Sequence, residues 1–184
     1  MYLTNKNLFV LSGGPGSGKT TVVDELEKLG FSCAPEVARQ IIKEQVRAGG
    51  KALPWSHREE FTHLMLQRSI QAYLEHMPAA SPMFTDRGIP DTLAYARLIG
   101  LHDATAIEDA CRYFRYAPLV FVAPPWEEIY KSDAERKQDF AEAERTFAEI
   151  SKAYGQYDYE LIELPKLPPP DRAQFILQTL HFAE

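Results

Sequence analysis

Short apolar runs alternate with amphipathic segments along most of the chain. The runs are rich in β-branched and aromatic residues and are bounded by glycine or proline, a pattern typical of buried strands. The predicted strands cover residues 8–11, 31–36, 83–85, 118–125 and 160–165. Apolar residues at helical spacing predict helices over residues 22–30, 35–50, 56–77, 90–100, 102–116, 126–154 and 168–180. Strands and helices therefore alternate along nearly the whole sequence.

This alternation implies a parallel sheet with helices on both faces. We expect an α/β protein with three α/β/α layers and a five-stranded parallel sheet, in one domain over residues 1–184. The length suits a single sizeable core, and no internal repeat or linker divides the chain. Ligands of such sheets bind at the carboxyl ends of the strands. Residues that follow the predicted strands are therefore the first candidates for function.

The segment GGPGSGKTT lies between the first predicted strand and the first predicted helix. It contains the Walker A pattern, in which a glycine is followed by four residues and then by glycine, lysine and threonine. The residues expected to bind the nucleotide are Gly13, Gly14, Pro15, Gly16, Ser17, Gly18, Lys19, Thr20 and Thr21. Glycines let backbone N–H groups approach the phosphates, and the following helix adds its positive end. Lys19 is expected to reach the β- and γ-phosphates and Thr20 to bind Mg²⁺, so the sequence predicts an ATP or GTP site.

Glu36 follows the second predicted strand, and Arg39 follows Glu36 within one helical turn. A carboxylate in this place can accept or orient the proton of a substrate hydroxyl that attacks the γ-phosphorus. Arg39 can neutralise phosphate charge. The alternative is a solvated glutamate at a helix start that pairs with Arg39 three residues later.

Asp86 and Arg87 end the third predicted strand. P-loop proteins carry a carboxylate associated with Mg²⁺ at such a strand end, so Asp86 is a candidate for metal binding and catalysis, and Arg87 would face the phosphates. The alternative is an aspartate that caps the following helix beside a surface arginine. Pro90 is well placed to begin that helix.

Residues 126–154 are strongly charged and predict a helical lid. Lys131, Arg136 and Lys137 lie between acidic stretches, and such cations can close over a nucleotide and stabilise the transition state. Arg136 is the catalytic candidate. The alternative is a solvated charged face. Capping boxes are expected at Ser132 with Glu135 and, earlier in the chain, at Ser56 with Glu59.

Composition excludes several other classes of protein. The net charge is −6 without a basic block, which argues against a nucleic-acid partner. The two cysteines and five histidines show no metal-ligand spacing. The first apolar run is too short for a signal peptide and no segment approaches membrane-spanning length, so we expect a cytoplasmic protein without a membrane partner.

The motifs GGPGSGKTT, PEVARQ and DRGIPDTLAYA, followed by the charged helical segment, resemble the P-loop nucleoside kinases. These include deoxynucleoside kinases, thymidylate kinase and the nicotinamide riboside kinase domain, and the likeness is greater still to the AAA-like ATPase group placed with that last domain. The resemblance implies a P-loop NTPase fold with a helical lid. It also implies that Glu36 and Arg39 contact an acceptor hydroxyl, that Asp86 and Arg87 form the acidic–arginine pair after the third strand, and that Arg136 is the lid arginine.

Two functions remain open from the sequence. The first is a kinase that transfers the γ-phosphate to a small hydroxyl-bearing acceptor such as a nucleoside or nucleotide. The second is an ATPase or GTPase switch that acts on a protein or lipid partner. Glu36 favours the kinase, because a plain ATPase has no obvious use for an acceptor-side carboxylate.

Overall fold

The central strand of the main sheet is β2 (Leu8–Gly13), which leads directly into the glycine-rich loop. The other strands are β3 (Ser32–Ala34), β4 (Met83–Asp86), β6 (Leu119–Ala123) and β7 (Glu160–Glu163). In the computed structural model, which describes residues 2–130 and 140–182, they form a five-stranded sheet of order β3-β4-β2-β6-β7. All four strand pairs are parallel. The predicted parallel sheet is thereby confirmed.

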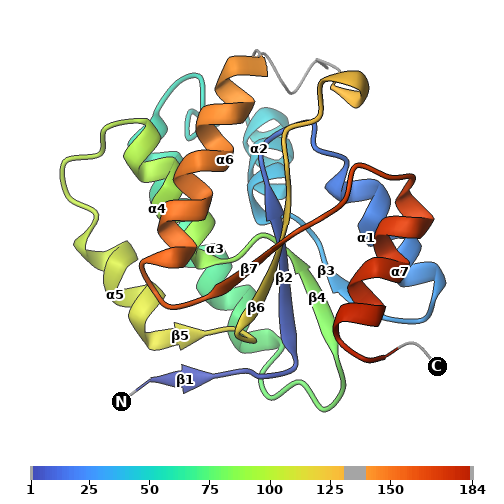
Figure 1. The fold of residues 1–184 in the computed structure, drawn as a ribbon. Coiled ribbons are helices and arrows are strands. Elements are labelled where there is room, and N and C mark those ends of the chain that lie inside the picture. Colours follow the sequence, from blue (N-terminus) through green and yellow to red (C-terminus); the bar gives the residue numbers. More distant parts are fainter. Residues whose placement is uncertain (1, 131–139, 183–184) are drawn as a thin grey trace.

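Helices cover both faces of this sheet, which gives the three predicted layers (Figure 1). Helices α1 (Lys19–Lys28) and α7 (Pro169–Thr179) pack together on one face. The remaining helices are α2 (Val37–Ala48), α3 (Arg58–Glu75), α4 (Ile89–Leu98), α5 (Thr105–Tyr113), α6 (Phe140–Gly155) and the short 3₁₀ helix η1 (Glu127–Ile129). Of these, α3 to α6 bury their apolar sides in the core of the opposite face.

The alternation of side chains along β2 explains why there are two cores. Successive residues of a strand point to opposite faces. Leu8 and Val10 join the core beneath α3 to α6, whereas Phe9 and Leu11 join the core beneath α1 and α7. The continuous apolar run therefore marks a strand that is buried on both sides, as expected for the middle of a parallel sheet.

Three sequence-based details differ from the structure. The helix predicted over 102–116 ends at Tyr113, because residues 114–115 form strand β5 (Phe114–Arg115), which pairs with β1 (Leu3–Thr4) in a separate two-stranded sheet. The capping box at Ser56 is wrong. A turn in which the Ser56 N–H donates to the Leu53 carbonyl leaves Ser56 before the helix, so that His57 is the N-cap.

The third difference concerns the predicted lid. From Phe140 onward this segment is the core helix α6, which packs against α4 and buries Ile150 and Tyr154. The second capping box, at Ser132 and Glu135, lies outside the described residues. No helix within residues 2–130 and 140–182 is long and apolar enough to cross a membrane.

Candidate functional site

The three predicted strand ends meet at the carboxyl edge of the sheet. Strand β4 lies beside β2, with Asp86 in register with Leu11, and β3 lies on the other side of β4. A cavity of about 490 Å³ opens there. Its lining includes the phosphate loop from Pro15 to Thr20, Glu36 and Arg87. The structure thus brings together groups that are far apart in the sequence.

The glycine-rich loop packs tightly against the rest of the fold. Gly13 has a φ of 138°, and a Cβ added there would lie 2.4 Å from the Ala123 carbonyl oxygen of the neighbouring strand β6. A side chain at this position therefore meets both backbone strain and a rigid obstacle. The Ser17 hydroxyl donates to the Gly14 carbonyl at 2.8 Å, which closes the loop on itself.

Lys19 is buried at the first turn of α1 and points into the loop. Its Nζ donates to the carbonyls of Gly13 at 3.0 Å and Gly14 at 2.9 Å. Burial, followed by the nearby charge of Arg87, lowers the pKa of Lys19 to about 8. The ammonium group therefore still carries its charge at neutral pH, beside the place where the sequence predicts phosphates.

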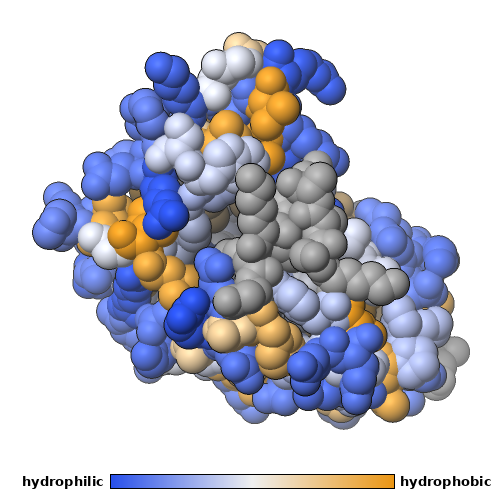
Figure 2. Space-filling view, turned by 90° about the horizontal axis from the view of Figure 1, so that it is seen from above, coloured by the Kyte–Doolittle hydropathy of each residue, from blue (hydrophilic) through white to orange (hydrophobic). Residues whose placement is uncertain are grey.

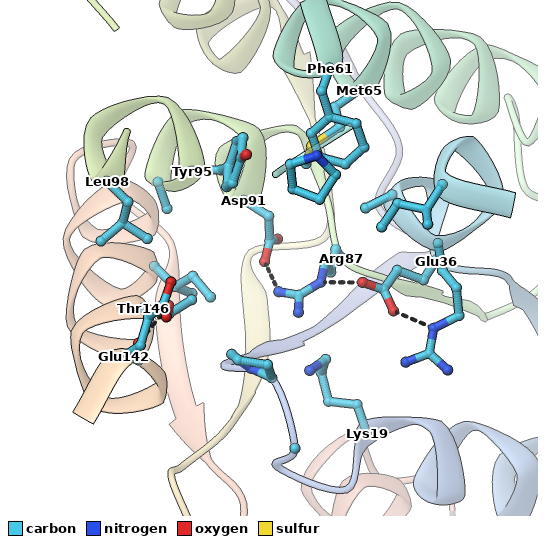
Figure 3. Close-up of a pocket in the computed structure, with 18 of the residues that line it drawn as sticks. Lys19, Glu36, Phe61, Met65, Arg87, Asp91, Tyr95, Leu98, Glu142 and Thr146 are labelled. Atoms are coloured by element: carbon cyan, nitrogen blue, oxygen red, sulfur yellow. Dashed lines mark hydrogen bonds and ion pairs between the residues drawn. The ribbon is translucent and has the colours of Figure 1, made fainter. Parts of the chain in front are cut away.

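Arg87 is at the centre of a network of charged groups (Figure 3). Its Nε donates to Glu36 Oε1 at 3.0 Å, and its Nη1 donates to the Gly13 carbonyl at 2.9 Å and to Asp91 Oδ1 at 3.1 Å. Arg87 has a φ of 75°, a left-handed conformation that is uncommon for a residue with a side chain. Such strain is typical of functional sites, where the surrounding contacts hold it in place.

Glu36 is the N-terminal cap residue of α2 and has two cationic partners. One is Arg87 and the other is Arg39, whose Nε lies 3.6 Å from Glu36 Oε2. Burial alone raises the pKa of Glu36, but the charges of Arg87 and Lys19 outweigh burial and hold this pKa below its usual value. The predicted pair with Arg39 is present, although the shorter contact is the one to Arg87. Glu36 is therefore an ionised carboxylate at neutral pH.

Asp86 ends β4 and is 6% exposed. Its Oδ1 has no hydrogen-bond partner among the described residues. Burial raises the pKa of Asp86 to about 6, against the opposing effect of Lys19. The alternative of a helix-capping aspartate is not what the structure shows, because Asp91 accepts the cap N–H of Gly88 instead.

The cavity also has an apolar half, which lies away from the phosphate loop. Phe61 and Met65 come from α3, and Tyr95 and Leu98 come from α4 (Figure 3). The rings of Phe61 and Tyr95 meet edge to face with centroids 5.6 Å apart. The Tyr95 hydroxyl is buried without a hydrogen-bond partner among the described residues. Figure 2, which looks onto this end of the molecule, shows apolar patches separated by hydrophilic residues.

Comparison with known proteins identifies the family. The model of an AAA domain family matches residues 8–172. The chain belongs to this AAA domain family. The family match starts in β2 and ends in α7, so it includes the loop, the cavity and the whole sheet. No curated protein matches the sequence.

Solved structures of P-loop kinases share the fold of this AAA domain. The deoxyadenosine kinase from M. mycoides with bound dATP superposes with a TM-score of 0.64 and 14% identity over 95% of this chain and 99% of that chain. The NadR protein in complex with NR superposes with a TM-score of 0.71 and 16% identity. This match covers 96% of the present chain but only 51% of the NadR chain. Shikimate kinase from Acinetobacter baumannii in complex with shikimate superposes with a TM-score of 0.56 and 20% identity, over 95% of this chain and 93% of that chain. At these identities the likeness shows the fold.

Sequence reasoning missed several residues of the site in this AAA domain. Asp91 was not singled out, although it follows Asp86 in the same motif. Phe61 falls in the helix predicted over residues 56–77 and is buried, but it also lines the cavity. Arg172 of α7 is 2% exposed and supports the phosphate loop by donating to the Ser17 carbonyl at 2.9 Å. The predicted lid residue Arg136 lies outside the described residues.

Proposed function

We propose that this AAA domain is an ATP- or GTP-dependent kinase that phosphorylates a hydroxyl group of a small acceptor with a ring-shaped apolar part, such as a nucleoside. One observation carries the proposal: the ionised pair of Glu36 and Arg87 lies between the phosphate loop and an apolar pocket in the same cavity. Such a cavity can hold a nucleotide phosphate chain on one side and an acceptor on the other.

The phosphate side is built from groups that bind anions. Backbone N–H groups of the loop and the N-terminus of α1 attract the phosphate chain. Lys19 and Arg87 place two cations beside the loop, both in contact with the Gly13 carbonyl. Arg136, which lies outside the described residues, is proposed from the sequence alone as a further cation that acts on the phosphates. These charges would stabilise the transferring phosphoryl group, which is the main task of such a site.

The residues around Asp86 also fit a Mg²⁺ ion. Asp86 offers a buried carboxylate oxygen that lacks a partner in the described structure, and the exposed Thr20 lines the cavity at the start of α1. Mg²⁺ prefers few protein ligands and retains several waters. When bound, the ion would neutralise phosphate charge.

The acceptor side is assigned to Glu36 and the apolar pocket. The acceptor hydroxyl would donate to the Glu36 carboxylate while its oxygen attacks the γ-phosphorus. The new bond joins that oxygen to phosphorus, the bond from phosphorus to the β–γ bridging oxygen breaks, and the hydroxyl proton passes to Glu36. Phe61 and Tyr95 would hold a ring by apolar contact. The names of the similar structures, which include nucleoside and shikimate kinases, support a small acceptor.

Glu36→Gln tests this assignment. An acceptor is first found by a thermal-shift screen of nucleosides and other metabolites with a non-hydrolysable ATP analogue. Glu36→Gln is then expected to keep nucleotide affinity and to lose about 10²- to 10⁴-fold in the transfer rate, because the amide oxygen cannot take up the hydroxyl proton and carries no negative charge. Glu44→Gln, at an exposed ion pair with Arg68, is the control and should transfer at the wild-type rate. Wild-type transfer by Glu36→Gln would contradict the kinase mechanism and favour a nucleotide switch.

A further inference from the structure

Asp91 is a buried carboxylate on α4 that reaches the site through Arg87. Its Oδ1 accepts from Ser12 Oγ at 2.5 Å and from Arg87 Nη1 at 3.1 Å, and its Oδ2 accepts from Tyr154 Oη at 2.6 Å and from the Gly88 N–H at 2.9 Å. A carboxylate has about four lone-pair positions, so these donors use its full capacity. The orientation of Asp91 is therefore fixed from every side.

The donors to Asp91 come from three parts of the fold. Ser12 belongs to β2 and directly precedes the phosphate loop, Arg87 and Gly88 form the turn into α4, and Tyr154 belongs to α6. Burial, and then the Asp91 charge, raises the pKa of Tyr154 well above its usual value, so the phenol remains a proton donor. One carboxylate thus ties the strand of the phosphate loop, the strained turn and a core helix together.

Capping of α4 explains only one of these contacts. An acidic residue in the first turn of a helix commonly accepts the N–H of the N-cap residue, as Asp91 accepts that of Gly88. A neutral asparagine oxygen accepts such an N–H equally well. The bonds from Ser12, Arg87 and Tyr154 serve no cap, and they join a side chain that is only 4% exposed to the guanidinium of Arg87.

We propose that Asp91, supported by Tyr154 and Ser12, is a positioning residue that holds the Arg87 guanidinium for the transferring phosphoryl group. The proposal rests on the proposed kinase function, which assigns Arg87 to the phosphates. Glu36 accepts a hydrogen bond from the Nε of Arg87. The Nη1 of Arg87 donates both to Asp91 and to the Gly13 carbonyl. A guanidinium held on these two sides presents Nη2 to a phosphate oxygen without reorganisation, which is what makes such a donor effective.

The test measures how well the site holds a mimic of the transferring phosphoryl group. Binding of ADP with Mg²⁺ is titrated by calorimetry with and without aluminium fluoride, so no acceptor is needed. In the wild type, aluminium fluoride should tighten ADP binding. Asp91→Asn and Tyr154→Phe should each reduce this tightening by about tenfold and leave the affinity for ADP alone within about twofold. Asparagine keeps the cap on α4, and Tyr154→Phe serves if Asp91→Asn does not fold.

Tyr159→Phe is the matched control. Tyr159 packs edge to face on Tyr154 with centroids 5.4 Å apart, and its hydroxyl accepts from the Tyr116 N–H rather than donating to Asp91. The Tyr159→Phe variant therefore loses a buried hydroxyl in the same core, but aluminium fluoride should tighten its ADP binding as much as in the wild type. If all three variants behave alike, the positioning role of Asp91 is wrong. If aluminium fluoride does not tighten ADP binding to the wild type, the role of Asp91 is overturned, whereas the proposed kinase function is tested separately by phosphoryl transfer to the acceptor.

Discussion

At the scale of single residues, buried charge is concentrated at one place. Lys19, Asp86 and Asp91 are among the few charged residues of the described chain that are less than 10% exposed, and all three lie around Arg87. Burying charged groups is unfavourable unless they are paired or have a function. The Asp86 carboxylate has the least support in this cluster, because one of its oxygens lacks a partner within the described residues.

Asp86 makes the unfolding free energy depend on pH in a predictable direction. Its pKa rises from 3.8 to about 6 on folding, so the native state binds its proton more tightly than the unfolded chain. At low pH, where Asp86 is protonated in both states, its raised pKa does not affect the unfolding free energy. The unfolding free energy falls as the pH rises from about 4 to about 6, and the loss is constant above that interval. Asp86→Asn should remove it. Urea unfolding of metal-free wild type and variant at several pH values measures this.

We expect the unfolding free energy of Asp86→Asn, relative to that of the wild type, to increase as the pH rises from about 4 to about 6 and to stay constant at higher pH. A stability difference between Asp86→Asn and the wild type that stays constant from pH 4 to pH 7 would contradict the assigned shift.

At the scale of elements, the phosphate loop depends on contacts with strand β6. The Cβ that is absent from Gly13 would overlap the Ala123 carbonyl, and Gly13 pairs in register with Ala123 in the parallel ladder. The loop therefore starts where the sheet leaves no space for a side chain. Backbone groups cannot move aside as side chains can, since they are held by the ladder.

Gly13→Ala should consequently damage both stability and nucleotide binding. Gly30→Ala is the matched control, because Gly30 also has a positive φ of 91° but no atom within 4 Å of its absent Cβ. Gly30→Ala is expected to cost about 1 kcal/mol of unfolding free energy from backbone strain alone. Gly13→Ala should cost about 1–3 kcal/mol more because of the overlap. Urea unfolding and titration with ATP measure both effects, and equal behaviour of the two variants would refute the packing role of Gly13.

At the scale of the whole molecule, two cores share one sheet. Neighbouring residues of β2 and β6 contribute alternately to the core under α3 to α6 and to the core under α1 and α7. Neither core can lose its strands without exposing the other. We therefore expect the chain to unfold as one domain in a single transition.

Two leucine variants test this cooperativity. Leu26 of α1 and Leu93 of α4 are both fully buried and belong to different cores. Leu26→Ala and Leu93→Ala should each lower the unfolding free energy by about 2–5 kcal/mol. Tryptophan fluorescence and far-UV circular dichroism should give coincident transitions for both. A separate phase that only one of the variants shifts would show that the two halves unfold independently.

The sequence by itself determined the parallel α/β fold and the position of the phosphate loop. These features are encoded locally, since the strand, the glycine spacing and the helix lie within one continuous segment and hydrophobic periodicity marks each element. Glu36 and Asp86 were predicted at the ends of strands for the same reason, because the end of a strand can be recognised from the residues that immediately surround it. The role of each of these residues remains a prediction.

Only the tertiary structure decided which side chains meet. The order β3-β4-β2-β6-β7 places Arg87 between Glu36 and Asp91, and α6 brings Tyr154 to Asp91 from 63 positions along the chain. Helical periodicity likewise predicts a helix over residues 56–77, but it does not show that a cavity lies beside Phe61. Contacts between distant segments depend on strand order and helix packing, which arise from the summed burial of the whole chain rather than from any local pattern.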